Sequence, residues 1–459
     1  MYIARRLERV PTQKLGTLAK TTASAFYPAA TQLYASGDTA FVRCVDCIND
    51  PVISKDQDER FEKIPRSFAE ENKGISILKQ NEIVVTKVGT PCYASIIEDY
   101  DEVALSRTVL GLTHIQNADP YYLMVFLRCH YGFHQLYRKR ELTIQYQLTL
   151  PRVQDLDIFL PSASFQSGVA HMAKEYRRMI SQSVQLYREA QKQLYVHSHF
   201  EHSRLFAKNT VEKSFSASFG ATGRLDAEYY QPKYDELFTL LHQSPTEKLG
   251  RIVTLMKSIE PGSAYYADEG IPFIRVSDVS PMGIRPPSIH IPPTIVPSIE
   301  HLYPRKDTVL FSKDGSVGIA YRVEEDMEAV TSGALLHLRI REGMAVLPDY
   351  LALVLNSELV RLQAERDASG TVIGHWSTSD IQKIIVPMLP LHIQQDIAAR
   401  VQQSFALRRR AERCIAAAVR AVEIAVEEDE AAALASFACV NDVHGYKNTA
   451  DRDLRYSMR

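Results

Sequence analysis

The sequence has no run of about 18 apolar residues, the length that a helix needs to cross a bilayer, so we expect no membrane span. Only six cysteines are scattered over 459 residues, which indicates reduced thiols and a cytoplasmic protein. An excess of basic residues is missing too, because 53 Lys and Arg face 55 Asp and Glu. A simple electrostatic nucleic-acid binder is usually basic. The net charge of −2 still allows a basic groove opposite an acidic docking surface.

Motifs of enzymes that act on nucleic acids are also lacking. There is no Gly-x-x-x-x-Gly-Lys-Ser/Thr loop for a motor and no Asp…Glu-x-Lys set for a nuclease. No apolar strand precedes Phe219 to Gly223, so this segment is not a methyl-donor loop. The Asp-Pro-Pro-Tyr loop of adenine methylases is incomplete at Asp119, which we interpret as a helix cap with Pro120 at the first helical position. No catalytic residue is therefore predicted in this chain.

The most informative feature present is an internal duplication. Short segments recur in the same order, and the distance between the two copies drifts only from 226 to 234 residues. The pairs are Lys14 to Gly16 with Lys248 to Gly250, Tyr34-Ala35 with Tyr266-Ala267, Phe41 to Asp46 with Phe273 to Asp278, Thr86 to Gly89 with Ser312 to Gly315, Tyr122-Leu123 with Tyr350-Leu351, and Gln166 with Gln394. Each match is weak alone, but their common order predicts two copies of one domain.

Both copies show the same sequence of expected elements. Residues 83–86 and 308–311 are typical of buried strands that run into a glycine turn. Residues 119–127 and 348–362 are expected to form helices, with Asp119 and Asp349 near their starts. A proline-marked boundary follows in each copy, at residues 159–161 and 386–390. The pattern predicts an α+β fold with two globular domains.

A long helix is expected after each boundary. Between Phe165 and Leu194 the apolar residues are spaced by three or four positions, which is nearly a heptad seam. The second seam, from Ile393 to Ala425, is looser. Each apolar seam needs a partner, and the duplication supplies one seam per copy. We therefore expect the two helices to form an antiparallel coiled coil with pseudo-twofold symmetry.

The second copy resembles the specificity subunits of type I restriction–modification systems. The similar segments are Arg224 to Tyr234 at the opening of the repeat, Phe273 to Asp278 as its early strand, and Gly370 to His375 with Ile381 to Gln394 at its exit into the long helix. The resemblance extends over about residues 13–200 and 224–434. The first copy lacks a counterpart of Arg224 to Tyr234, and its exit segment from Pro161 to Gln166 is degenerate.

The resemblance implies a non-catalytic, cytoplasmic subunit in which two target-recognition domains each read half of a split site on double-stranded DNA. Its implied partners are modification (methyltransferase) subunits, two per complex, and restriction or motor subunits, with no membrane. It implies no cofactor and no metal on this chain, whereas S-adenosylmethionine, ATP and Mg are expected on the partner subunits.

The resulting division of the chain has six parts. They are target-recognition domain 1 at residues 1–160, long helix 1 at 161–200, a linker with the start of the second repeat at 201–246, target-recognition domain 2 at 247–388, long helix 2 at 389–434, and a polar, disordered tail at 435–459.

The leading candidates for DNA contact lie in the glycine turns. Lys313 and Gly315, with Ser312 and Ser316, form a Gly- and Ser-rich turn whose amides can approach a phosphate closely while the lysine supplies charge. A hairpin turn that needs glycine for its backbone, with a solvated lysine, is the alternative. In the first copy the equivalent candidates are Thr86, Lys87 and Gly89.

Two arginines and a histidine are further candidates. Arg43 and Arg275 follow strands, and arginine can bind guanine edges or phosphate. A local pair with Asp46 or Asp278 that orders the loop is the equally weighted alternative. His375, which follows Gly374, can hydrogen-bond to DNA; its neighbour Trp376 is the only tryptophan of the chain and can belong to the core instead.

Two other patterns are interpreted as structural. Cys44-x-x-Cys47 could open a zinc site with Cys92 and Cys129, but valines take the aligned positions in the second copy, which indicates packing. His130 and His134 are four residues apart without an evident third ligand, and we interpret them as surface or core groups.

Two other functions remain open. One is an enzyme with its own DNA methylase or nuclease site, which the missing motifs oppose. The other is a coiled-coil scaffold that binds only protein, which the large globular share of the chain opposes.

Overall fold

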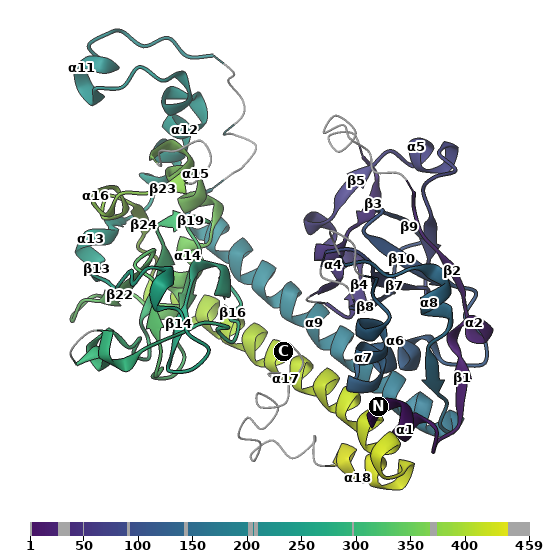
Figure 1. The fold of residues 1–459 in the computed structure, drawn as a ribbon. Helices are drawn as coiled ribbons and strands as arrows, with labels where there is room; N and C mark the ends of the chain where they lie inside the picture. The colour runs from purple at the N-terminus through teal and green to yellow at the C-terminus, as the bar shows by residue number, and fades with distance from the viewer. Residues whose placement is uncertain are drawn as a thin grey trace. The chain divides into compact units, whose positions relative to one another are not determined.

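The computed structural model describes residues 2–25, 37–48, 50–89, 92–141, 146–200, 205, 210–295, 298–367 and 374–438. The chain divides into two compact units (Figure 1). Unit 1 consists of Met1–Gln182 and Leu407–Arg459, and unit 2 consists of Ser183–Ala406. Tyr34 and Ala35, part of the predicted duplication, lie outside the described residues, as do residues 439–459 of the predicted tail.

Unit 1 contains two sheets and a strand pair. The five-stranded sheet has the order β2 (Lys20–Thr22), β10 (Val109–Thr113), β7 (Ile83–Thr86), β8 (Ala94–Ile97) and β4 (Val52–Ile53). The four-stranded sheet has the order β5 (Glu62–Ile64), β3 (Thr39–Val42), β9 (Glu102–Leu105) and β6 (Ile77–Lys79). The first strand β1 (Thr12–Lys14) pairs with the last, β11 (Asp157–Phe159).

The helices of unit 1 lie around these strands. Six are short: α1 (Tyr2–Leu7), α2 (Leu15–Leu18), α4 (Cys44–Ile48), α5 (Arg66–Glu71), α7 (His130–Arg138) and α8 (Leu150–Gln154). Buried α6 (Pro120–Arg128) begins as predicted, because the Asp119 Oδ1 atom accepts hydrogen bonds from the backbone N–H groups of Tyr121 and Tyr122, at 2.8 and 3.2 Å.

Unit 2 repeats this plan. Its four-stranded sheet has the order β13 (Val253–Lys257), β22 (Leu335–Ile340), β18 (Val309–Ser312) and β20 (Ala320–Arg322), and its three-stranded sheet has β17 (His290–Ile291), β14 (Ile271–Ile274) and β21 (Val330–Thr331). The strand pairs are β12 (Thr246–Lys248) with β24 (Ile385–Pro387), β15 (Val279–Ser280) with β16 (Gly283–Ile284), and β19 (Asp314–Gly315) with β23 (Gly374–His375). The helices are α11 (Phe219–Thr222), α12 (Pro232–Leu241), α13 (Leu249–Ile252), α14 (Pro348–Leu355), α15 (Glu358–Asp367) and α16 (Thr378–Ile381).

The predicted helix over residues 348–362 is wrong in one respect, because the structure has two helices, α14 and α15, in its place. The break falls at Asn356, whose Nδ2 atom donates to the carbonyl oxygens of Ala320 and Ala352, at 2.7 and 2.9 Å. The backbone N–H of Ala320 donates in turn to the Asn356 Oδ1 atom at 2.9 Å. Such side-chain hydrogen bonds to the backbone compete with helix continuation.

The duplication is confirmed by equivalent hydrogen bonds in the two units. The hydroxyl of Tyr122 donates to the carbonyl oxygen of Phe159 at 2.7 Å, and that of Tyr350 donates to the carbonyl oxygen of Pro387 at 2.8 Å. The buried strands match as well, because β3 pairs in parallel with β9 in unit 1 and β14 pairs in parallel with β21 in unit 2. The matched sequence segments therefore form the same tertiary contacts in both units.

The two long helices are α9 (Ala163–His197) and α17 (Leu391–Glu427), and a shorter helix, α18 (Glu430–Ala438), follows. Each unit contains a part of both long helices (Figure 1). In unit 1, Ser162 donates its backbone N–H to Glu430 at 2.8 Å, and the thiol of Cys414 lies 3.4 Å from the carbonyl oxygen of Met172. These partners run in opposite order along the two helices, which confirms antiparallel packing.

The same packing continues in unit 2. There the hydroxyl of Ser404 donates to the carbonyl oxygen of Ser183 at 2.7 Å, and the rings of Tyr187 and Phe405 stack with their centroids 6.4 Å apart. Because each unit holds a stretch of both helices, the units end within the helices, at residues 182 and 406. The predicted tail at 435–459 begins as helix, since α18 ends at Ala438.

Candidate nucleic-acid interface

Two equivalent turns follow β7 and β18. We call the segment from Thr86 to Tyr93 turn 1 and the segment from Ser312 to Ile319 turn 2. The side-chain oxygen of Thr86 accepts a hydrogen bond from the backbone N–H of Tyr93 at 2.9 Å, and that of Ser312 accepts one from Ile319 at 2.8 Å. Both hydroxyl residues are fully buried. The structure therefore places these two predicted contact residues inside the turns, where they hold the loop closed.

The two turns share an unusual backbone. Gly89 and Gly315 have φ angles of 85° and 75°, and Cys92 and Gly318, three residues later, have 86° and 90°. These angles lie in the region that favours glycine. A side chain at Gly89, Gly315 or Gly318 would meet no heavy atom within 4 Å. The turns are therefore open at these three glycines, where a ligand can approach the backbone.

The lysine of turn 2 is not a solvated cation. Lys313 forms an ion pair with the neighbouring Asp314, whose other oxygen lies 2.9 Å from the Nδ1 atom of His375. Antiparallel pairing of β19 with β23 brings Asp314 and His375 together. Burial raises the pKa of Asp314, but hydrogen bonds from Lys313 and His375 outweigh this effect and hold the pKa below its usual value. Ser316 and Gly315 are exposed beside this cluster.

Trp376 anchors the turn-2 cluster to the core. Its backbone N–H donates to the carbonyl oxygen of Lys313 at 2.9 Å, and its ring lies 5.9 Å from that of Phe311, fully covered by the unit. It is therefore a packing residue, the alternative that the sequence left open.

The lysine of turn 1 has different neighbours. Val88 stands where turn 2 has Asp314, and Gln147 stands where unit 2 has His375, since a β-bridge joins Val88 to Gln147. Within the described ranges Lys87 forms no ion pair, and burial together with the charge of Arg107 lowers the pKa of Lys87. Sequence matching missed Gln147, because the bridge joins segments about sixty residues apart.

Arg43 and Arg275 each pair with the aspartate three residues later, which is the structural alternative to DNA contact that the sequence offered. The backbone N–H and the Nε atom of Arg43 both donate to Asp46 Oδ2, at 2.8 and 3.3 Å. The same two groups of Arg275 approach Asp278 Oδ2 at 2.9 and 3.5 Å. Both aspartates are buried, so each pair orders the segment that follows its strand. Both arginine side chains stay partly exposed, at 28% and 37%, and Arg43 already makes a second contact, because its Nη1 atom donates to Glu62 Oε1 at 3.3 Å.

The cysteines occupy apolar surroundings. Cys44 and Cys47 belong to a hydrophobic cluster of unit 1, and burial raises the pKa of the Cys47 thiol well above its usual value. Burial likewise raises the pKa of Cys92 to about 12. The rings of His130 and His134 contact each other, with centroids 4.4 Å apart. Among the described residues, no group of three or more His, Cys, Asp or Glu could hold a metal ion.

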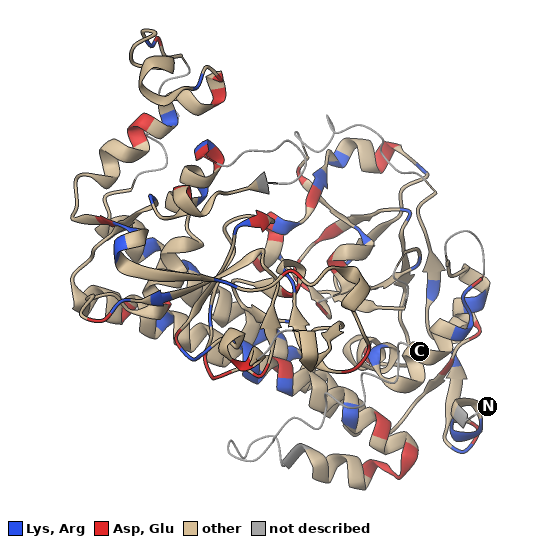
Figure 2. Ribbon diagram, turned by 60° about the vertical axis from the view of Figure 1, so that its left-hand side comes forward, with Lys and Arg blue, Asp and Glu red and all other residues tan. Residues whose placement is uncertain are grey.

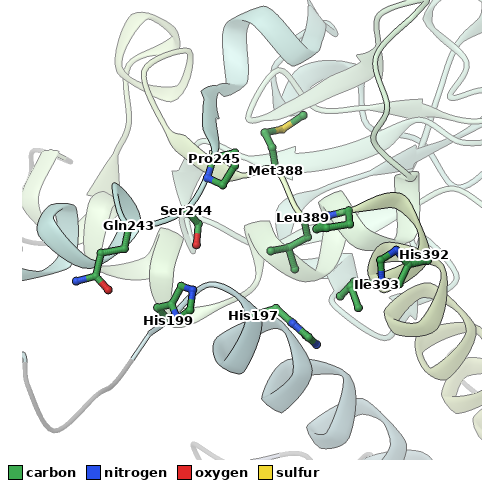
Figure 3. Close-up of a pocket in the computed structure, with 10 residues that line it drawn as sticks. His197, His199, Gln243, Ser244, Pro245, Met388, Leu389, His392 and Ile393 are labelled. Atoms are coloured by element: carbon green, nitrogen blue, oxygen red, sulfur yellow. The ribbon is translucent and has the colours of Figure 1, made fainter.

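A cavity of about 530 Å³ lies in unit 2 (Figure 3). It is bordered by His197 and His199 at and after the end of α9, by Ser244 before β12, and by Leu389 and His392 just before and at the start of α17. Basic and acidic residues are interspersed along the chain in both units (Figure 2).

No helix among the described residues is long and apolar enough to cross a membrane.

Comparison with known proteins identifies the second copy. Residues 247–413 match the family described as the type I restriction modification DNA specificity domain. None of the curated proteins matches the chain. The S subunit of a type I restriction–modification system from M. genitalium is similar at 12% identity, over 91% of this chain and 94% of that one, with a TM-score of 0.42. The HsdS subunit from Thermoanaerobacter tengcongensis is similar at 17% identity, over 95% and 96%, with a TM-score of 0.27.

The matched residues 247–413 include the whole of turn 2 and the first part of α17. Unit 1 repeats the strands, the turn and the tyrosine hydrogen bond of that matched domain. Residues 247–413 are therefore a type I restriction modification DNA specificity domain.

Proposed function

We propose that the chain reads a split DNA target, with one half-site read by unit 1 and the other by unit 2. The observation that carries this proposal is the repeated turn, whose two positive φ angles and buried hydroxyl hydrogen bond occur in both units. An open turn with glycine on its surface lets backbone N–H groups approach phosphate oxygens, which positions a protein on DNA without reading sequence. Two copies of such a turn favour two similar docking events.

Differences around the shared turns favour two different half-sites. Turn 2 carries the charged cluster of Lys313, Asp314 and His375, whereas turn 1 has Val88 and Gln147 at the positions of the last two. Sequence is read by donors and acceptors that reach base edges, and these differ between the two clusters. A valine offers neither donor nor acceptor, while aspartate accepts and histidine can do both. The two units should therefore prefer different bases.

We further propose that the chain has no catalytic centre and directs chemistry on partner subunits. Two modification subunits would methylate adenine with S-adenosylmethionine, and restriction subunits would cleave with ATP and Mg. The incomplete Asp-Pro-Pro-Tyr segment supports this view, because Asp119 caps α6 and both of its backbone partners lie in that helix. An enzyme with its own methylase or nuclease site is the competing function. Purified chain that methylates or cuts DNA without partners would establish it.

Co-purification of this chain with a modification subunit from the same organism, followed by single-molecule sequencing of methylated adenines, tests the proposal. We expect a bipartite motif with two different half-sites and an unread spacer of fixed length. A coiled-coil scaffold without DNA readout would give a complex that methylates without sequence preference, or none at all. A single contiguous motif would show that only one unit reads DNA.

A further inference from the structure

Gln147 and Leu148 lie directly beside turn 1. Gln147 forms β-bridges with both Val88 and Glu141, and the backbone N–H of Leu148 donates to the carbonyl oxygen of Lys87 at 3.1 Å. Three stretches of backbone are therefore joined at the turn. Arg140 immediately precedes Glu141, and its charge lowers the pKa of Cys92 in turn 1, against the larger effect of burial.

This arginine is held by two aromatic rings. The guanidinium carbon of Arg140 lies 3.3 Å from the ring centroid of Tyr137 and 4.2 Å from that of Tyr146. Its Nε atom donates to the carbonyl oxygen of Tyr137 at 2.8 Å. Both tyrosines are exposed, at 37% and 45%, so the three side chains form a surface cluster that we call the arginine clamp. Cation–π contacts and the hydrogen bond restrict the rotamers of the arginine.

The arginine clamp is fixed to turn 1 by further ring contacts. Tyr137 stacks on Phe133 with centroids 6.0 Å apart, and Phe133 contacts Tyr93, the last residue of turn 1, at 6.0 Å. Arg128 lies over the opposite end of this series, 5.8 Å from the Tyr93 ring. Movement of the arginine relative to the turn would disturb each of these contacts.

The charge of Arg140 is available to a ligand. In the portions of the chain that the structure describes, no carboxylate forms an ion pair with Arg140, although Glu141 is its neighbour in sequence. Glu141 accepts from the Nε atom of Arg152 at 2.8 Å instead. The Nη1 and Nη2 groups thus keep the parallel donors with which arginine recognises two acceptors at once.

We propose that Arg140 reads a guanine in the half-site of unit 1, which deepens the proposed function and rests on it. Arginine donates to the O6 and N7 atoms of guanine in the major groove, and this is the commonest base-specific contact of proteins with DNA. The open turn and Lys87 beside it supply the contacts to phosphate, which tolerate mobile side chains. A guanidinium held between rings and turn instead has the fixed direction that base reading needs.

Among the described residues of unit 2, Arg366 also lies over two rings, those of Tyr229 and Phe238, but it is paired with Asp367 at 2.7 Å. The residue of α15 that aligns with Tyr137 is Glu365, which is bound to Lys233 and Arg361 at 3.1 and 2.7 Å. An effect of Arg140 should therefore be limited to one half of the site.

The test uses the complete complex of this chain with its modification subunit and sequences methylated adenines on a random DNA library. In Arg140→Ala we expect discrimination at one guanine–cytosine pair of one half-site to fall roughly 5- to 150-fold, the range for one bidentate contact. Arg140→Met, which keeps the apolar stem over the rings, should give the same loss. Arg138→Ala, which removes an exposed arginine two residues away, should leave the motif unchanged.

Other outcomes overturn the proposal. Uniformly weaker binding of all sequences, with a salt slope about one unit smaller, would make Arg140 a phosphate contact. An unchanged motif in both folded variants would give it no part in readout. If the unaltered complex shows no bipartite motif, the proposed function itself is wrong, and this result is independent of the Arg140 variants.

Discussion

Replacement of Gln394 by leucine should selectively destabilise unit 2. This side chain at the start of α17 is fully buried, and its amide makes three hydrogen bonds to the backbone. Its Oε1 atom accepts from the N–H of Leu347 at 3.0 Å, and its Nε2 atom donates to the carbonyl oxygens of Ala345 and Leu389, at 2.9 and 2.8 Å. Leucine keeps a comparable volume but leaves all three backbone groups without this partner. At roughly 1 kcal/mol for each lost bond, and more for a buried N–H, the cost is about 3–5 kcal/mol.

Gln166 provides the matched control in unit 1. It makes two bonds of the same kind, accepting from the N–H of Asp119 and donating to the carbonyl oxygen of Pro161, both at 3.0 Å, and it is only partly buried. Gln166→Leu should therefore cost about 2 kcal/mol, in unit 1. Hydrogen exchange followed by mass spectrometry measures the free energy of opening in each unit separately. A Gln394→Leu protein that loses under 1 kcal/mol, or that opens in unit 1, would refute the reasoning.

Further predictions concern unit 2. Burial lowers the pKa of His337 to about 4, below its usual 6.5, so its contribution to stability is complete above pH 6.5 and is lost as the pH falls towards 4. The free energy of unfolding of unit 2 should fall by up to about 3 kcal/mol in this pH range, and His337→Gln should remove that part of the pH dependence. Urea unfolding at several pH values measures it, and a variant with the same pH profile as the unaltered protein would contradict this prediction. Lys313→Ala should weaken DNA binding by the assembled complex at every sequence and reduce the salt slope by about one unit, whereas normal binding with earlier melting would make Lys313 structural. Asp314→Asn, which removes the carboxylate paired with Lys313, should strengthen binding up to about fivefold in a titration at low salt, and weaker binding would show that the carboxylate orders the turn.

Local sequence signals predicted several strands, helix starts and turns of the fold. The strand at Ile83–Thr86 has the predicted bounds, and Asp119 caps α6 with Pro120 as its first residue. The matched glycines at positions 89 and 315 correctly indicated one turn in two copies. These features depend on a few neighbouring residues, so a single sequence contains the necessary information.

Contacts between distant segments were not predictable in this way. Asn356 ends α14 through a hydrogen bond to β20, some 36 residues earlier in the chain. Asp314, which forms the ion pair with Lys313, is the next residue in the sequence. The second partner of Asp314 is His375, which the pairing of β19 with β23 brings beside it. The arginine clamp likewise needs the bridge between Val88 and Gln147 to place it beside turn 1. Strand pairing, which sequence patterns do not specify at this range, therefore decides which predicted residues share a surface.

If the two units read two halves of one site, a domain transplant should exchange one half alone. Residues 247–388, which contain turn 2 and its charged cluster, would replace the corresponding segment of a related specificity subunit, and the methylated adenines would be mapped by single-molecule sequencing. We predict that one half of the methylated motif changes, while the other half and the spacer length remain those of the recipient. A change in both halves, or a single contiguous motif, would show that the two units do not read separate half-sites.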